Sequence, residues 1–200
     1  PNLPDHPDLR TGAVYGTGKR EENLRGYFAA ISAMDEQIGR LLDAVEEQGL
    51  ADNTVILFTA DNGMSMGQHG VWGKGNGTFP MNMYDSAVKV PFLISWPGHI
   101  PANTVCSEMI SACDLLPTIL KLTGLSDKQP TGLPGRSFTE LLKGEQRDHR
   151  DEVVIFDEYG PVRMIRTKEW KYVHRYPYGK HELYYLVDDP GEEKNLYGLP

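Results

Sequence analysis

The segment from Thr54 to Gly75 reads TVILFTADNGMSMGQHGVWGKG, and in it an apolar run ends in a carboxylate, an amide, a histidine, a lysine and several glycines. Residues 54–60 are β-branched or apolar and carry no charge, which predicts a strand that is buried on both faces. Asp61 and Asn62 follow directly at its carboxyl end. Ligands of open α/β sheets bind beyond the carboxyl ends of the strands, so a functional site is predicted here.

The residues on either side of this segment favour an α/β fold class. Apolar residues recur upstream at steps of three and four, at Ile31, Met34, Ile38, Leu41 and Val45. This spacing predicts an amphipathic helix, with Gly49 just past its end. A second buried strand is predicted over residues 90–95. Because typical sheets have about five or six strands, we expect strands from an upstream segment to complete this one.

Two further helices are predicted downstream. One begins near Asp114, with Pro117 in its first turn and Gly124 after its end. The second is short, opens at Ser137-Phe-Thr-Glu140, which has the spelling of a capping box, and ends at Gly144.

The last fifty residues have a different pattern of apolar residues and turns from the rest of the chain. Four short apolar runs separated by turns predict an antiparallel meander with strands over residues 152–157, 162–166, 170–174 and 182–187. The predicted organisation is an extended lead-in over residues 1–20, an α/β part over 21–135, and a small α+β subdomain, antiparallel sheet plus helix, over 136–200. Aromatic residues gather in this subdomain and favour either a carbohydrate platform or cross-strand packing; they are Trp170, Tyr172, Tyr176, Tyr178, Tyr184 and Tyr185.

Composition excludes several classes of function. Acidic residues outnumber basic ones 28 to 20, the formal charge is −8, and no basic stripe is present, so we expect no nucleic-acid partner. No apolar run is long enough to cross a membrane. Cys106 and Cys113 lack metal-ligand spacing and are predicted to be ordinary thiols. Because the chain begins at Pro1 rather than at methionine, we expect a processed or truncated piece, which leaves the compartment open.

Four residues of the quoted segment are candidates for the site. Asp61 and Asn62 offer hard oxygen ligands of the kind that calcium or magnesium prefers, although a DNG tripeptide is also typical of a plain turn. Two ligands are fewer than the roughly six oxygens that such a cation needs, so others must come from elsewhere. Lys74 is interpreted either as a contact for an anionic group or as a solvated lysine. His69 is interpreted either as a proton donor or ligand-orienting residue, or as a structural histidine.

At this point the chain resembles the C-terminal half of a type I sulfatase of the alkaline phosphatase superfamily. Six phrases in the family's order carry the resemblance: YFAAISAMDEQIGRLLDAVEEQGLADNTVILFTADNG, GQHGVWGKG, VPFLISWPG, CDLLPTIL, GRSFTELLKGE and ELYYLVDDPGEEKNLY. The resemblance implies an alkaline phosphatase-like α/β sandwich with a small C-terminal subdomain. It also implies that Asp61 and Asn62 bind a divalent cation, usually calcium, that Lys74 contacts a sulfate oxygen, and that His69 neighbours them in the active site.

The family's nucleophile is a formylglycine, made from the Cys or Ser of a C/S-x-P-x-R motif, whose hydrated aldehyde attacks sulfur. This chain departs from that pattern, because Cys106 is followed by Ser-Glu-Met and Cys113 by Asp-Leu-Leu. The family's upstream Asp-Asp metal pair is also absent. We therefore expect the formylglycine to lie outside these residues, and the chain alone not to hydrolyse sulfate esters.

Three functions remain open from the sequence. The first is hydrolysis of an organic sulfate ester, with a sulfated small molecule or carbohydrate as substrate, and the resemblance favours an exported, periplasmic or extracellular enzyme. The second is a phosphodiesterase or phosphonate monoester hydrolase of the same superfamily. The third is a non-catalytic carbohydrate-binding module in which Asp61 is only a turn residue.

Overall fold

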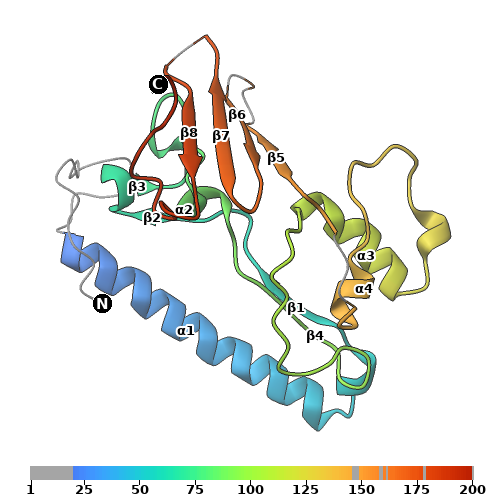
Figure 1. Ribbon diagram of the computed structural model, residues 1–200. Coiled ribbons are helices and arrows are strands. Elements are labelled where there is room, and N and C mark those ends of the chain that lie inside the picture. Colours follow the sequence, from blue (N-terminus) through green and yellow to red (C-terminus); the bar gives the residue numbers. More distant parts are fainter. Residues whose placement is uncertain (1–19, 146–148, 158–159, 161, 178, 200) are drawn as a thin grey trace. The chain divides into compact units, whose positions relative to one another are not determined.

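A computed structural model describes residues 20–145, 149–157, 160, 162–177 and 179–199 (Figure 1). The predicted lead-in lies outside these residues, apart from Arg20, which begins the first helix. The chain divides into two compact units. Unit 1 consists of residues 1–94, 157–162 and 174–181, and unit 2 of residues 95–156, 163–173 and 182–200. The subdivision into 21–135 and 136–200 stays a prediction.

The long helix α1 of unit 1 spans Arg20–Glu47 and confirms the predicted helix. Gly49 has a φ of +67°, and the Leu50 N–H donates to the Val45 carbonyl at 3.0 Å, which closes the last turn. Part of the apolar stripe is open to solvent, because the Met34 and Leu41 side chains are 46% and 66% exposed. No helix among the described residues is both long and apolar enough to cross a membrane.

Strands β1 (Ile56–Thr59) and β4 (Phe92–Ser95) pair in a two-stranded sheet. Both predicted strands are confirmed, at shorter lengths. The predicted burial on both faces is wrong, since β1 is only partly buried and Leu93 of β4 is 64% exposed. A strand is buried on both faces only where layers cover both, and the described residues supply two strands and no complete covering layers here.

Short elements connect these two strands. The 3₁₀ turn η1 (Ala51–Asn53) precedes β1. A hairpin of β2 (Ser65–Met66) and β3 (Trp72–Gly73) follows β1, with the turn η2 (Gln68–Gly70) at the tip of the hairpin. Then come the turn η3 (Gly75–Gly77) and the one-turn helix α2 (Asp85–Val88). These elements are too short to leave a periodic pattern in the sequence.

Unit 2 contains both predicted downstream helices. The turn η4 (Ala112–Asp114) leads into α3 (Leu115–Leu122), and Gly124 has a φ of +72° just past its end, as predicted. The turn η5 (Ser126–Lys128) follows.

Helix α4 (Thr139–Leu142) ends before Gly144, as predicted, but the predicted capping box at its start is wrong. Its N-cap residue is Phe138, which makes no side-chain cap, and the Ser137 hydroxyl accepts from the Thr139 N–H at 3.3 Å rather than from the Glu140 N–H. The Glu140 carboxylate pairs instead with Lys121 of α3, so a tertiary ion pair replaces the local contact. A capping box that the sequence analysis missed joins Ser111 and Asp114 before α3.

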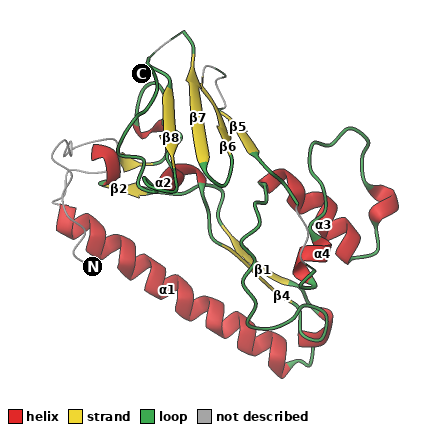
Figure 2. Cartoon of the chain, viewed as in Figure 1, coloured by secondary structure: helices red, strands yellow, loops and turns green. Residues whose placement is uncertain are grey.

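The C-terminal strands form one four-stranded sheet, in the order β5-β6-β7-β8, which confirms the predicted meander (Figure 2). The strands are β5 (Val153–Phe156), β6 (Val162–Arg166), β7 (Trp170–Arg175) and β8 (Glu182–Tyr185). Strands β5 and β6 pair antiparallel, as do β7 and β8. The sheet contributes four buried apolar side chains to the core: Val162, Met164, Val173 and Tyr184.

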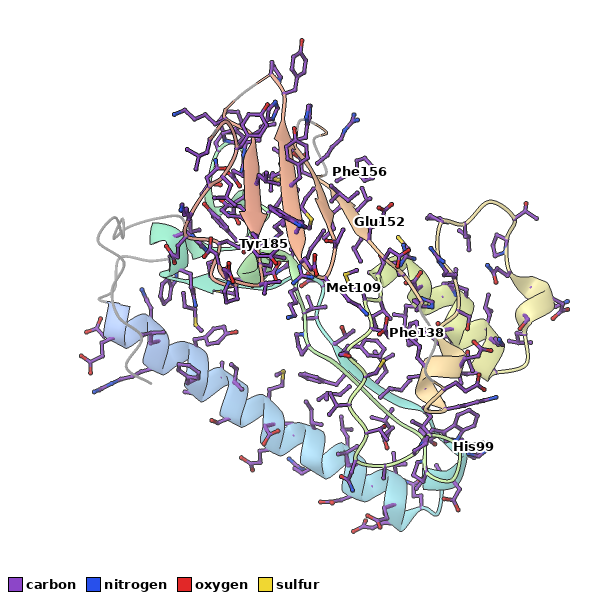
Figure 3. All side chains as sticks on the ribbon, viewed as in Figure 1. His99, Met109, Phe138, Glu152, Phe156 and Tyr185 are labelled. Atoms are coloured by element: carbon purple, nitrogen blue, oxygen red, sulfur yellow. The ribbon has the colours of Figure 1, made fainter. Side chains whose placement is uncertain are left out.

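The aromatic residues of the sheet are engaged in packing. Trp170 lies opposite Tyr185, which is labelled in Figure 3, and their ring centroids are 4.6 Å apart. Tyr184 is 4% exposed, and Tyr172 packs at 6.1 Å from Tyr197. Cross-strand packing therefore accounts for Trp170 and Tyr185, whereas Tyr172 packs on a residue that follows β8 and Tyr184 is buried in the core.

Candidate active site

The candidate site begins where β1 ends, in the bend that contains Asp61 and Asn62. Gly63 holds this bend against α2, because its N–H donates to the Ala87 carbonyl at 2.9 Å. A Cβ atom at Gly63 would lie 2.2 Å from the Ser86 carbonyl oxygen, so only glycine allows this close approach. The backbone contact fixes where the Asn62 side chain starts.

The hairpin brings Lys74 back to this bend. Ser65 pairs with Gly73 across the two short strands, so the end of β3 lies beside the start of β2. Lys74 follows immediately, and its Nζ donates to Asn62 Oδ1 at 2.9 Å. The structure thus brings together two of the residues that the sequence predicted for the site.

The charge around Lys74 suits an anionic ligand. Within the described part of the chain, its ammonium donates to the neutral Asn62 amide, and no carboxylate pairs with it. The side chain is half-buried rather than fully exposed, and its contact with a sulfate oxygen stays a prediction. A partly desolvated ammonium without a counter-charge attracts anions such as sulfate or phosphate oxygens.

His69 lies at the tip of the same hairpin, in η2. Its φ of +54° is uncommon for a residue other than glycine, and its ring stacks on Tyr84 with centroids 3.6 Å apart and planes 4° from parallel. Such backbone strain is found at functional sites, where surrounding contacts hold it in place. The arrangement seats His69 beside the start of α2, and its catalytic role stays a prediction.

The predicted metal ligands have suitable chemistry but form an incomplete set. Asp61 is exposed and offers a carboxylate, while Asn62 Oδ1 uses one lone pair for Lys74 and keeps a second for a cation. Among the described residues, no group of three or more His, Cys, Asp or Glu side chains could hold a metal ion. Calcium takes six to eight oxygen ligands, so these two residues fit it as part of a larger site.

Sequence analysis missed Asn82, which shapes the loop after Lys74. The residue is 2% exposed, and its Nδ2 donates to the carbonyl oxygens of Lys74 and Gly75 at 3.1 and 3.2 Å. Its N–H also donates to the Gly75 carbonyl at 3.0 Å. Nothing in the local pattern marks this role, apart from one amide between Met81 and Met83 in a short apolar stretch.

A second polar cluster lies in unit 2, around the fully buried Asp114. Its carboxylate accepts from the backbone N–H groups of Ser111 and Arg136 at 2.8 and 2.9 Å, and from Arg150 Nη2 at 2.5 Å. Burial opposes the charged form, but these backbone donors and the Arg150 guanidinium outweigh it and hold the Asp114 pKa below its usual value.

This cluster links several segments of unit 2. His149 Nε2 lies 3.4 Å from the Asp114 carboxylate, and its ring packs edge-on against Phe138, which is labelled in Figure 3. The buried carboxylate therefore joins the start of α3 to the segments before α4 and β5. Cys113 beside it and Cys106 are free and exposed, as the sequence predicted for ordinary thiols.

Comparisons with known proteins agree with this architecture. The sulfatase family model matches residues 1–125, and the model for the C-terminal part of N-sulphoglucosamine sulphohydrolase matches residues 67–200. The N-acetylglucosamine-6-O-sulfatase of Bacteroides thetaiotaomicron is 31% identical over 206 residues, covering 96% of this chain and 35% of that relative.

Solved structures give the same result. A protein in complex with its substrate, D-glucosamine-2-N,6-O-disulfate, matches with a TM-score of 0.79 and 30% identity, over 90% of this chain and 37% of that one. The phosphonate monoester hydrolase of Silicibacter pomeroyi matches with a TM-score of 0.70 and 28% identity, over 83% of this chain and 35% of that one. These matches confirm the predicted alkaline phosphatase-like α/β fold. The chain spans about a third of the length of the curated relatives it matches.

Proposed function

Since the chain belongs to the sulfatase family, we propose that it forms part of an enzyme that hydrolyses an organic sulfate ester. One observation carries the proposal: the Lys74 ammonium lies 2.9 Å from the Asn62 amide oxygen, at the carboxyl end of β1. A lysine ammonium next to an oxygen that can bind a metal ion suits a substrate group whose negative charge is spread over several oxygens.

Each site residue has a proposed role. Asp61 and Asn62 hold a divalent cation, calcium in the first instance and magnesium as the alternative, which supplies charge neutralisation at the reacting group when bound. Lys74 donates to a sulfuryl oxygen and stabilises the charge that develops there. His69, fixed by its stack on Tyr84, donates a proton or orients the ester.

The nucleophile is proposed to be a formylglycine outside these residues. Neither Cys106 nor Cys113 lies in a C-x-P-x-R motif. The 200-residue chain by itself is therefore expected to be inactive. Turnover of an aryl sulfate by this chain alone would contradict that expectation.

A sulfated carbohydrate is the proposed substrate class. The support is similarity to a curated N-acetylglucosamine-6-O-sulfatase and to a protein solved with a disulfated glucosamine as its substrate. The solved protein matches over 90% of this chain.

A direct assay tests the proposal. The protein that carries this chain is produced with formylglycine formation enabled, and release of sulfate from p-nitrophenyl sulfate and from sulfated N-acetylglucosamine is measured with calcium present. We expect sulfate release that stops after chelation and returns with calcium. No release from either ester, in protein shown by mass spectrometry to contain formylglycine, would refute the function.

The second candidate is phosphonate monoester or phosphodiester hydrolysis. The similarity to a phosphonate monoester hydrolase favours it, and an ammonium beside a metal ligand suits phosphoryl oxygens as well as sulfuryl ones. The same preparation is therefore assayed on phenylphosphonate and phosphodiester analogues. A higher kcat/KM on these esters than on sulfate esters would favour the second candidate.

A further inference from the structure

The loop from Lys74 to Asn82 is closed on itself by its last residue. The Lys74 carbonyl accepts from the Gly77 N–H at 2.8 Å and from Asn82 Nδ2 at 3.1 Å. The Gly75 carbonyl accepts from both the N–H and the Nδ2 of Asn82, at 3.0 and 3.2 Å. The backbone of Lys74 and of the residue after it is therefore tied to one amide side chain.

The orientation of that amide is determined by its surroundings. Its Nδ2 faces three acceptors, namely the carbonyls of Lys74 and Gly75 and, at 3.4 Å, Thr78 Oγ1. Its Oδ1 is buried and has no hydrogen-bond partner among the described residues. A donor is needed at this position, so an isosteric carboxylate could not replace it. Leaving an acceptor buried without a partner opposes folding, so the donor side must be well satisfied.

The same segment is anchored from a second direction within unit 1. Arg175, at the end of β7, is 7% exposed, and its Nη1 donates to the Met81 carbonyl at 2.5 Å. The contact between Arg175 and Met81 thus fixes the backbone beside Asn82, and Asn82 in turn bonds the Lys74 carbonyl.

We propose that Asn82 is a positioning residue that fixes the Lys74 backbone, so that the ammonium is already in place for a sulfate oxygen. This inference rests on the proposed function of Lys74. Electrostatic stabilisation by a charged donor depends on its being held in the productive geometry before the reaction, and long lysine side chains reach that state only when their backbone is fixed.

A double-mutant cycle in the protein that carries this chain tests the proposal. Asn82→Ala is expected to lower kcat/KM for sulfate ester hydrolysis by about 10- to 100-fold, because misplacing a catalytic group by about 1 Å can cost about 10²-fold. In a Lys74→Ala background the same change is expected to cost less than about threefold, because the group it positions is gone. Additive effects would overturn the proposal, since they would mean that Asn82 acts independently of Lys74.

A second readout does not depend on activity. Lys74 acylation is measured by mass spectrometry after brief treatment with acetic anhydride, with the exposed Lys89 of the same unit as internal reference. Asn82→Ala is expected to change the ratio of Lys74 acylation to Lys89 acylation at least about threefold, in line with the coupling energies of residues in contact. An unchanged ratio would overturn the proposal even if the wild-type protein hydrolyses no sulfate ester. A changed ratio without sulfate release would refute the proposed function alone.

Two further variants separate positioning from general stability. Asn195→Ala removes an amide whose Oδ1 accepts from the Leu183 and Tyr197 N–H groups in unit 2, and it is expected to leave the Lys74 ratio unchanged. Asn82→Ser keeps a short donor and is the milder variant if Asn82→Ala does not fold. It is expected to give an intermediate ratio, and a wild-type ratio in Asn82→Ser would count against the proposal.

Discussion

Lys74 Nζ donates to Asn62 Oδ1 across 2.9 Å, although twelve positions separate the two residues in the chain. The contact forms because the β2–β3 hairpin turns the chain back and because Gly63 seats the preceding bend against the backbone of α2. It leaves a half-buried ammonium beside an amide that keeps one oxygen lone pair. The relationship is the basis of the proposed anion and cation contacts.

Replacing Lys74 with alanine is expected to reduce kcat for sulfate ester hydrolysis by about 10²–10³-fold, as for the loss of one preorganised donor to a developing charge. Lys74→Arg keeps the charge but presents a planar fork, so partial activity is expected. Steady-state kinetics of the protein that carries this chain provide the measurement. Lys89→Ala removes an exposed lysine of the same unit and serves as the control. Equal losses in both alanine variants would contradict the role of Lys74.

Replacing Asp61 with asparagine is expected to weaken calcium binding by at least about tenfold, because even partners of metal ligands contribute that much. Isothermal titration calorimetry on chelator-treated protein measures the affinity. Asp35→Asn is the matched control, since Asp35 is an exposed acid of α1. Calcium affinity that is unchanged in Asp61→Asn would show that the DNG tripeptide is only a turn.

Gly63→Ala is expected to destabilise the fold by about 1–3 kcal/mol or more, as in overpacked sites, because the added Cβ would lie 2.2 Å from the Ser86 carbonyl oxygen. Gly39→Ala is the control: Gly39 lies in α1 with nothing within 4 Å of the added carbon, so this change is expected to stabilise by about 1 kcal/mol or less. Urea unfolding of both variants measures the difference. Similar unfolding free energies in the two variants would mean that the backbone around Gly63 accommodates the added carbon without loss of stability.

Asp114 is expected to contribute to stability in a pH-dependent way. Its pKa is lower in the folded state than in the unfolded chain, so its contribution is fully present above the unfolded value of about 3.9 and is lost as the pH falls through the folded pKa. The wild-type protein should therefore exceed Asp114→Asn in stability at neutral pH, and the gap should narrow below about pH 4.

Unfolding free energies measured at several pH values between neutrality and the acid limit of folding test this expectation. Asp43→Asn provides the comparison, because Asp43 is an exposed carboxylate of α1. A gap between wild type and Asp114→Asn that stays constant down to acid pH would contradict the assigned ionisation.

Much of the fold could be predicted because its signals are local. The apolar spacing that predicted α1 and the short apolar runs that predicted β6 and β7 depend only on the period of each element. The capping box predicted at Ser137 is wrong because its outcome depends on a tertiary contact. Glu140 forms an ion pair with Lys121 of another helix instead of bonding the start of its own helix. Likewise the exposure of Leu93 depends on which layers cover β4, and a strand's own residues do not encode that.

The sequence by itself determined the types of the elements, the family resemblance and the identities of Asp61, Asn62, Lys74 and His69 as candidate residues. Tertiary structure alone decided that Lys74 meets Asn62, that His69 lies against Tyr84, and that Asn82 ties down the Lys74 loop. The physical reason is the range of the interactions. Secondary structure follows from side chains three or four positions apart, whereas a site depends on hairpin register, close backbone approach and buried hydrogen bonds between residues that only folding brings together.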